Sequence, residues 1–322
     1  MTGSPAVSVR RSDAKPNAEG NLAAATRIGV VPILWNNADL QDLGPLVPAS
    51  TVLDEIARLG FSGTQRGVGF PTGTKLASEL AARNLRLAEL YVALPCGPSG
   101  PGAEALEHGR AALRDLQEAG GEVLVVALGL TPDRDEHVGR ARGAPALTDD
   151  GWRELGALLD RLGGESAELG HPLAFHNHAG TYVETSDEVD RLMESTSSRA
   201  VGLCLDVGHA TLGGGDPVSI IERHRDRLMH VHLKDVASGP LQALREGRLT
   251  GFEAALRARI FAPLGSGVLQ LPSVLRALTG AGYRGWLMVE QDTSWEHPSE
   301  AAAIGRSVLG AMLRWPVSRA GG

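Results

Sequence analysis

Histidines and carboxylates that could bind a metal ion or move a proton gather in the second half of the chain. Four short motifs carry them, FHNH, LDVGH, HVHLKD and VEQD, each at the end of an apolar run. The residues concerned are His176, His178, Asp206, His209, His230, His232, Lys234 and Glu290. Because side chains alternate along a strand, the two histidines of FHNH share one face, as do the histidines and the lysine of HVHLKD. Mixed imidazole and carboxylate sets bind divalent cations, so the motifs predict a metal site.

Each of these residues also has a structural interpretation when it is considered alone. A single histidine at a strand end is more often a hydrogen-bonded structural residue than a ligand. Lys234 beside Asp235 could equally form a structural ion pair. The repetition of such residues at consecutive strand ends favours the metal-site interpretation.

Eight short apolar runs could supply the strands that position these residues. They are Arg27–Ile33, Gly63–Arg66, Leu85–Val92, Glu122–Leu128, Pro172–Asn177, Val201–Asp206, Leu228–Leu233 and Trp286–Glu290. Helical patterns between them include Ala103–Ala119, Asp149–Leu169, Ser186–Glu194, Pro217–His224 and Leu271–Ala281. The alternation predicts an α/β fold, a single-domain (β/α)8 TIM barrel over residues 26–318. A doubly wound sheet is the alternative, but PILWNNAD follows the first run where that fold usually has a glycine-rich turn.

Two connections are unusually long, and the N-terminus has a different composition from the rest. Residues 131–147 and Ala237–Gly267 would lie at the C-terminal mouth of the barrel, where long loops form lids or bind ligands. Residues 1–25 are polar and small, which predicts a disordered N-terminal tail. Arg10 and Arg11 are followed by no apolar segment, so we expect no signal peptide.

Five segments then show a resemblance to a known family. They are HNHAGTYVET (His176–Thr185), LCLDVGHA (Leu203–Ala210), HVHLKDV (His230–Val236), PLGSG (Pro263–Gly267) and GYRGWLMVEQD (Gly282–Asp292). Together they resemble the xylose isomerase-like TIM barrels, which include sugar isomerases, epimerases and inosose dehydratases. The resemblance covers nearly the whole chain after residue 27. It is closest to the inosose dehydratase branch, whose members dehydrate 2-keto-myo-inositol.

The resemblance implies one divalent metal ion, Mn, Co or Zn, with Mg as an alternative. The family typically binds it through a glutamate, an aspartate, a histidine and a glutamate at the ends of strands five to eight. Asp206, His232 and Glu290 match the last three positions. At the first, either His176 replaces the glutamate or Glu184 reaches back from the following loop. We favour His176, because a strand holds its side chain more rigidly than a loop does.

This departure favours a carbon–oxygen lyase acting on a keto-inositol or a related keto-sugar. The family's isomerases use two metal-bound carboxylates as opposed acid and base, and His176 removes one of them. A β-elimination needs a metal to polarise the ketone, a base for the α-proton and an acid for the departing hydroxyl. We expect Glu184 or His178 as the base, and Lys234 or His209 as the acid or as a ligand of a substrate oxygen. A metal-dependent isomerase or epimerase is the alternative.

Further side chains are candidates for substrate contacts. His178 could bind substrate instead of acting as base, and Glu290 counts among the catalytic residues as well as the ligands. Most family members carry a carboxylate on strand two where TQR stands here, and Gln65 could still hydrogen-bond a substrate hydroxyl. Trp35 and Trp286 could stack on a ring, although aromatic residues at strand ends are more often core.

Composition excludes several other classes of protein. A net charge of −7 over 322 residues, without a basic cluster, argues against nucleic acid, and so against the abasic-site endonucleases that share this barrel. No apolar run is long enough for a membrane span. Two cysteines without a CxxC pair indicate a cytoplasmic protein. The runs Gly213–Gly215 and Gly265–Gly267 contain no Arg or Lys, so we expect turns there, not phosphate sites. A non-catalytic sugar-binding barrel stays open, and so does the oligomeric state, with a homodimer as one option.

Overall fold

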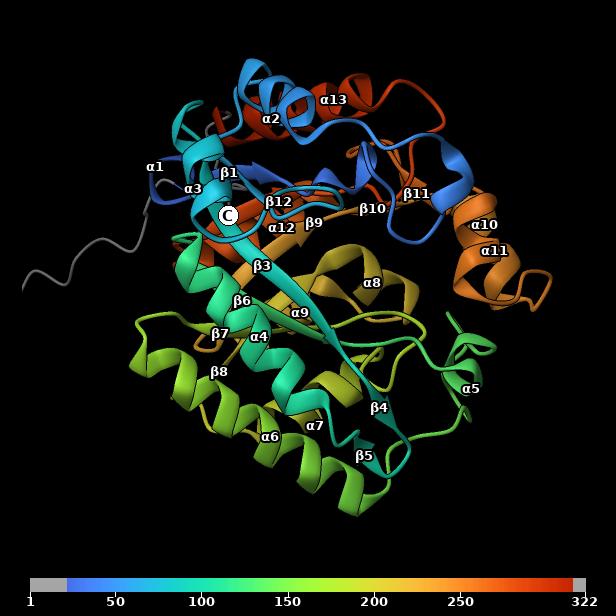
Figure 1. Ribbon diagram of the computed structural model, residues 1–322. Coiled ribbons are helices and arrows are strands. Elements are labelled where there is room, and N and C mark those ends of the chain that lie inside the picture. Colours follow the sequence, from blue (N-terminus) through green and yellow to red (C-terminus); the bar gives the residue numbers. More distant parts are fainter. Residues whose placement is uncertain (1–21, 315–322) are drawn as a thin grey trace, which may run out of the picture.

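Eight parallel strands close into a barrel in the computed structural model, which describes residues 22–314 (Figure 1). Around the ring their order is β1-β12-β9-β8-β7-β6-β3-β2, and every neighbouring pair is parallel. The strands are β1 (Arg27–Val30), β2 (Gly63–Gln65), β3 (Arg86–Leu94), β6 (Val123–Leu128), β7 (Leu173–His176), β8 (Val201–Asp206), β9 (Leu228–Leu233) and β12 (Trp286–Val289). The predicted (β/α)8 barrel is therefore confirmed.

One long helix follows each strand and packs on the outside of the barrel. In chain order these helices are α2 (Ala49–Arg58), α3 (Gly73–Ala81), α4 (Ala105–Glu118), α6 (Asp149–Glu168), α7 (Ser186–Ser195), α9 (Pro217–Arg223), α12 (Leu271–Gly280) and α13 (Pro298–Arg314). Each turns an apolar stripe inward, as α2 does with Val52, Leu53 and Ile56. Both faces of the strands are thus covered, which explains all-apolar runs such as VLVVAL in β6.

The barrel interior is filled with side chains below its mouth. Trp286, Met288, Ala88 and Val31 pack together inside the barrel, with Trp286 at its floor, and all four are buried. Trp286 also donates a hydrogen bond from Nε1 to Glu122. Trp286 is therefore a core residue at the opposite end from the predicted site, and ring stacking on a substrate is excluded for it.

The long connections carry short elements on the side toward which the strands point (Figure 1). They are α5 (Pro132–Asp135), the β4–β5 hairpin (Cys96–Gly97 and Gly100–Pro101), α8 (Val207–Leu212), α10 (Ser238–Arg245), α11 (Phe252–Arg257) and the β10–β11 pair (Asp235–Val236 and Phe261–Ala262). Three consecutive residues of α5 each bond to a different partner. Asp133 accepts from the Tyr182 hydroxyl, Arg134 pairs with Glu188, and Asp135 accepts from the backbone of α11.

Two boundaries differ from the sequence prediction by three residues or more. The first strand ends at Val30 because Pro32, which has no N–H to donate, begins a 3₁₀ turn, η1 (Pro32–Leu34). A second 3₁₀ turn, η2 (Gln41–Leu43), follows it. The expected tail lies outside the described residues except for its last four, which form α1 (Leu22–Ala25) because Leu22 is buried in the core. Within residues 22–314, no helix is both long enough and apolar enough to span a membrane.

Candidate functional site

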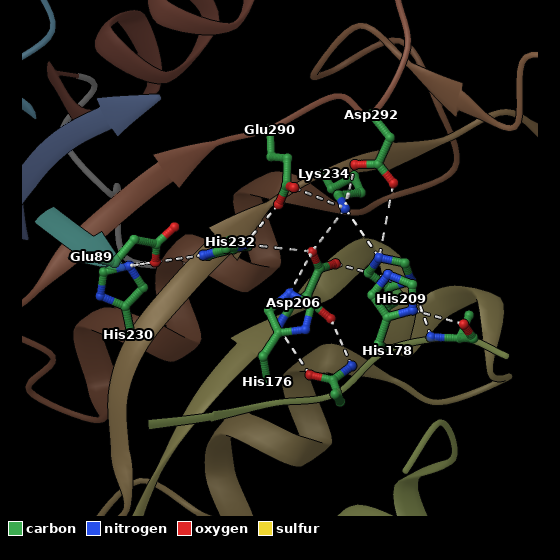
Figure 2. Close-up of polar contacts among 12 residues, drawn as sticks. Glu89, His176, His178, Asp206, His209, His230, His232, Lys234, Glu290 and Asp292 are labelled. Carbon is green, nitrogen blue, oxygen red and sulfur yellow. Dashed lines mark hydrogen bonds and ion pairs between the residues drawn. The ribbon is translucent and has the colours of Figure 1, made fainter. Parts of the chain in front are cut away.

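Four side chains able to bind a metal meet at the mouth of the barrel (Figure 2). His176 ends β7, Asp206 ends β8, His232 is the last but one residue of β9, and Glu290 follows β12 directly. One donor atom from each lies within 4.8 Å of those of the other three, and all four residues are buried. The structure therefore brings together the set that the sequence favoured.

The donor atoms point at one another rather than at ordinary hydrogen-bond partners. Oδ2 of Asp206 lies 3.5 Å from Nε2 of His176 and 3.9 Å from Nδ1 of His232. Nδ1 of His232 lies 2.7 Å from Oε2 of Glu290. Within the described part of the chain, Oδ2 of Asp206 and Nδ1 of His176 have no hydrogen-bond partner. Buried polar atoms are seldom left so, and two imidazoles with two carboxylates fit Mn, Co or Zn.

Asp206 is fixed from two sides, which leaves Oδ2 as its one oxygen without a hydrogen bond. Oδ1 caps helix α8 by accepting from the backbone N–H of His209 at 2.7 Å. The backbone of Asp206 is paired with the side chain of Asn177. Nδ2 of Asn177 donates to the Asp206 carbonyl, and Oδ1 of Asn177 accepts from the Asp206 N–H. Oδ2 is therefore held toward the other donors before any ion binds.

Lys234 lies beside the four donors and is surrounded by carboxylates. Its Nζ is 3.3 Å from Asp206, 3.3 Å from Glu290 and 2.6 Å from Asp292. Burial disfavours the ammonium, but these carboxylates raise the pKa of Lys234 well above its usual value, so it is charged. Gly208 makes this approach feasible, because a Cβ there would lie 2.8 Å from the Lys234 side chain.

Two further histidines form the edge of the site beside Lys234. The rings of His178 and His209 lie 3.8 Å apart, and Phe252 packs against both. Nδ1 of His178 bonds to the Ala179 carbonyl, so that nitrogen carries the proton and Nε2 is free to accept one. Burial, with smaller effects from neighbouring charges, lowers the pKa of His178 to about 3 and keeps the ring neutral. Nε2 of His209 lies 3.1 Å from Nζ of Lys234.

Glu184 lies in a different part of the mouth from the four donors. Its two oxygens accept backbone N–H bonds from Gly139 and Gly180, both at 2.8 Å, and Arg134 lies 3.7 Å away. Burial raises the pKa of Glu184 to about 7. The carboxylate therefore links two loops, and it is absent from the cluster of four donors.

The structure places the two other candidate substrate residues, Gln65 and Trp35, in different surroundings. Gln65 ends β2 and is half-buried, on the same strand face as the inward-pointing Gly63. Trp35 is buried in the layer between barrel and helices, where its Nε1 donates to Glu55 of α2 at 2.6 Å. Trp35 is thus used in packing, because the turn that begins at Pro32 directs it there.

Two buried carboxylates of the site were missed by the sequence reasoning. Asp292 is the nearest partner of Lys234, and its place in the VEQD motif could have indicated it. Glu89 lies inside the barrel on β3 and contacts both His230 and His232. A glutamate within the apolar run LAELYV was the available signal.

Asp235 shows that the sequence HLKD does not contain a lysine–aspartate ion pair. Its carboxylate accepts backbone N–H bonds from Val236, Gly265, Gly267 and Leu269. The PLGSG segment thus wraps around Asp235, as a structural turn, while Lys234 pairs with other carboxylates.

Comparisons with known proteins agree with this architecture. A family model described as Xylose isomerase-like TIM barrel matches residues 53–311. The rhizopine catabolism protein MocC of Rhizobium meliloti is 37% identical, over 91% of this chain and 90% of that protein. An inosose dehydratase of Geobacillus thermodenitrificans (strain NG80-2) is 34% identical, over 88% of this chain and 96% of that protein. The solved structure of an L-ribulose 3-epimerase matches with a TM-score of 0.66 at 18% identity, covering 89% of this chain and 94% of that one, and so shares the fold.

Proposed function

The chain belongs to the xylose isomerase-like TIM barrel family, and from this membership we propose that it is a metal-dependent dehydratase, a carbon–oxygen lyase, acting on a keto-inositol such as 2-keto-myo-inositol. The observation that carries the proposal is the set of side chains at the mouth of the barrel. Two imidazoles and two carboxylates are available for a metal, and a neutral imidazole and an ammonium remain beside them for proton transfer. Relatives named inosose dehydratase support the substrate class.

The four donors His176, Asp206, His232 and Glu290 would hold the ion. A divalent cation there would polarise the ketone of the substrate and stabilise the negative charge that develops on its oxygen. The preorganised Oδ2 of Asp206 favours binding because little of the chain has to reorder when the ion arrives.

We assign the proton transfers to His178 and Lys234. Nε2 of His178 takes the proton from the carbon next to the ketone, because its lone pair is unused. Lys234 donates a proton to the hydroxyl on the following carbon. That C–O bond breaks, the hydroxyl leaves as water, and a C=C bond replaces the C–H and C–O bonds. His209, whose Nε2 lies 3.1 Å from Nζ, holds Lys234 in place. After the product leaves, His178 gives its proton to solvent and Lys234 takes one from solvent, which restores both groups.

Two features support the finer parts of this assignment. Gln65, half-buried at the end of β2, is placed to hydrogen-bond a substrate hydroxyl. Cys96 and Cys204 are both buried free thiols, which supports a cytoplasmic location.

The test is turnover by metal-stripped protein after Mn, Co or Zn is added back. The substrates are 2-keto-myo-inositol and a panel of ketohexoses. We expect metal-dependent water loss, read as new dione absorbance, and its disappearance in Glu290→Gln. Glu296→Gln is the matched control, because that carboxylate is exposed a few residues further on. Ketose interconversion without water loss would make the protein an isomerase or epimerase. Turnover that is independent of metal would refute the site.

A further inference from the structure

A buried carboxylate lies behind the metal-binding histidine of β9. Glu89 has no solvent-exposed surface, and its Oε2 is 2.9 Å from Nε2 of His232 and 2.5 Å from Nε2 of His230. Figure 2 shows His232 between Glu89 on one side and Asp206 and Glu290 on the other. The two nitrogens of one ring thus face a buried carboxylate and the donor cluster.

We propose that Glu89 is a positioning residue that fixes the ring of His232 so that Nδ1 faces the metal. A carboxylate can only accept, so the ring nitrogen beside Glu89 carries the proton. Nδ1 faces Oε2 of Glu290 at 2.7 Å and Oδ2 of Asp206 at 3.9 Å. It is therefore the nitrogen that would give its lone pair to a metal ion bound between them, in place of the proton that it shares with Glu290. Carboxylates behind metal-bound histidines set the ring orientation and strengthen the ligand in the same way.

The surroundings of Glu89 favour this role over a purely structural one. A buried charge is costly unless it is paired and fully hydrogen-bonded. Oε1 of Glu89 and Nδ1 of His230 have no hydrogen-bond partner among residues 22–314. The cluster therefore leaves buried polar atoms unsatisfied, as a network built only for stability would not. Its one well-formed contact to the site is the bond to His232.

A second ion is the competing interpretation of the same residues. Donor atoms of Glu89, Cys204 and His232 also lie within 4.8 Å of one another. In that case Glu89 would be a ligand itself, and His232 would bridge two ions. The number of ions bound per chain distinguishes the two interpretations.

The experiment is a Co²⁺ titration of the metal-stripped full chain against a competing chelator, with the visible spectrum recorded. We expect one Co²⁺ per wild-type chain. Glu89→Leu should weaken binding by about 10- to 100-fold and change the spectrum, because Nδ1 is no longer held in place. Glu89→Gln keeps an acceptor oxygen and should lose less affinity, with an intermediate spectrum.

Two control variants separate positioning from folding. Val125→Ala, which shortens an apolar side chain inside the barrel and removes no polar atom, should lower thermal stability while its affinity and spectrum stay at wild-type values. His230→Gln removes the other imidazole on Glu89 and should change affinity by less than about threefold, a small fraction of the effect expected for a group that orients a ligand. If Glu89→Leu does not fold, Glu89→Gln decides.

Three results would overturn the inference. The first is that the Glu89 variants bind Co²⁺ with wild-type affinity and a wild-type spectrum. The second is that Val125→Ala loses as much Co²⁺ affinity as the Glu89 variants do. The third is that the wild type binds two Co²⁺ per chain and Glu89→Leu binds one. The inference rests on the proposed metal centre and not on the substrate. A wild type that binds no Co²⁺ refutes both, whereas bound Co²⁺ without turnover of any ketose refutes only the proposed reaction.

Discussion

Replacing Arg134 with methionine should destabilise the protein more than removing any exposed arginine. The Arg134 side chain is fully buried in the loop after β6, and it donates to both carboxylate oxygens of Glu188 at 2.7 and 3.1 Å. It also donates to the Pro145 carbonyl, and Glu184 lies 3.7 Å away. Methionine has a similar length but no charge, so two glutamates would lose their common partner.

The size of the effect follows from what the substitution leaves behind. Breaking a buried ion pair by removing one partner costs about 3–5 kcal/mol, since the other charge stays buried and uncompensated. Glu188 keeps 16% of its side chain exposed and can partly rehydrate, so the lower value, about 3 kcal/mol, applies. At roughly 2 °C per kcal/mol for a large domain, the melting temperature should fall by about 6 °C.

Thermal unfolding of the metal-stripped protein measures this loss. Arg110→Met is the matched control, because Arg110 also contacts two glutamates but keeps 26% exposure, and such pairs contribute about 0–1 kcal/mol. Adding Glu188→Gln to Arg134→Met should recover part of the loss, because it removes the carboxylate charge that Arg134 neutralises. Equal melting temperatures for the Arg134 and Arg110 variants would refute the reasoning.

Three other outcomes are expected. Glu184 has its pKa raised by burial from 4.5 to about 7, so its contribution to stability is present below pH 4.5 and lost as the pH rises through 7. The wild type should therefore lose its advantage over Glu184→Gln in urea unfolding between pH 5 and pH 8, and a constant difference would contradict the assignment. Asn177→Ala should cost about 1–3 kcal/mol and weaken metal binding, because the backbone of Asp206 loses both bonds; unchanged metal affinity would show that this brace is dispensable. Trp35→Phe should lower stability by about 1 kcal/mol, because the hydrogen bond to Glu55 is lost, and should leave KM unaltered. A raised KM would indicate that Trp35 contacts the substrate.

The barrel could be predicted because it depends on short-range periodicity, and the donor set could be predicted because the family resemblance implied it. Parallel strands place their carboxyl ends at one rim, so His176, Asp206 and Glu290 were brought together by strand order alone. Side-chain direction after a turn could not be predicted in this way. Trp35 points into the helix layer because Pro32 ends the strand early, and Glu184 turns toward loop amides whose positions depend on long-range packing.

Glu89 and Asp235 show a second limit of sequence reasoning. Both are acidic residues next to the predicted site, but Glu89 faces the proposed metal ligand His232 from inside the barrel and Asp235 is enclosed by the PLGSG turn. Their types were visible in the sequence, whereas their partners come from segments distant along the chain. The register shift between β2 and β3, where Thr64 pairs with Leu87 and Gln65 with Glu89, leaves Ala88 as an extra residue of β3 and breaks the simple alternation from which facing directions are inferred.

The packed floor of the barrel has a kinetic consequence. Because Trp286, Met288, Ala88 and Val31 fill the barrel interior, a substrate bound at the proposed metal donors would have to arrive and leave through the mouth. Under the proposed reaction, the dione and the released water must leave by the route through which the ketone entered. The next substrate molecule therefore cannot bind at the donors until the dione has left. The dione should accordingly inhibit the forward reaction competitively, and turnover at saturation should respond to solvent viscosity if product escape is the slow step.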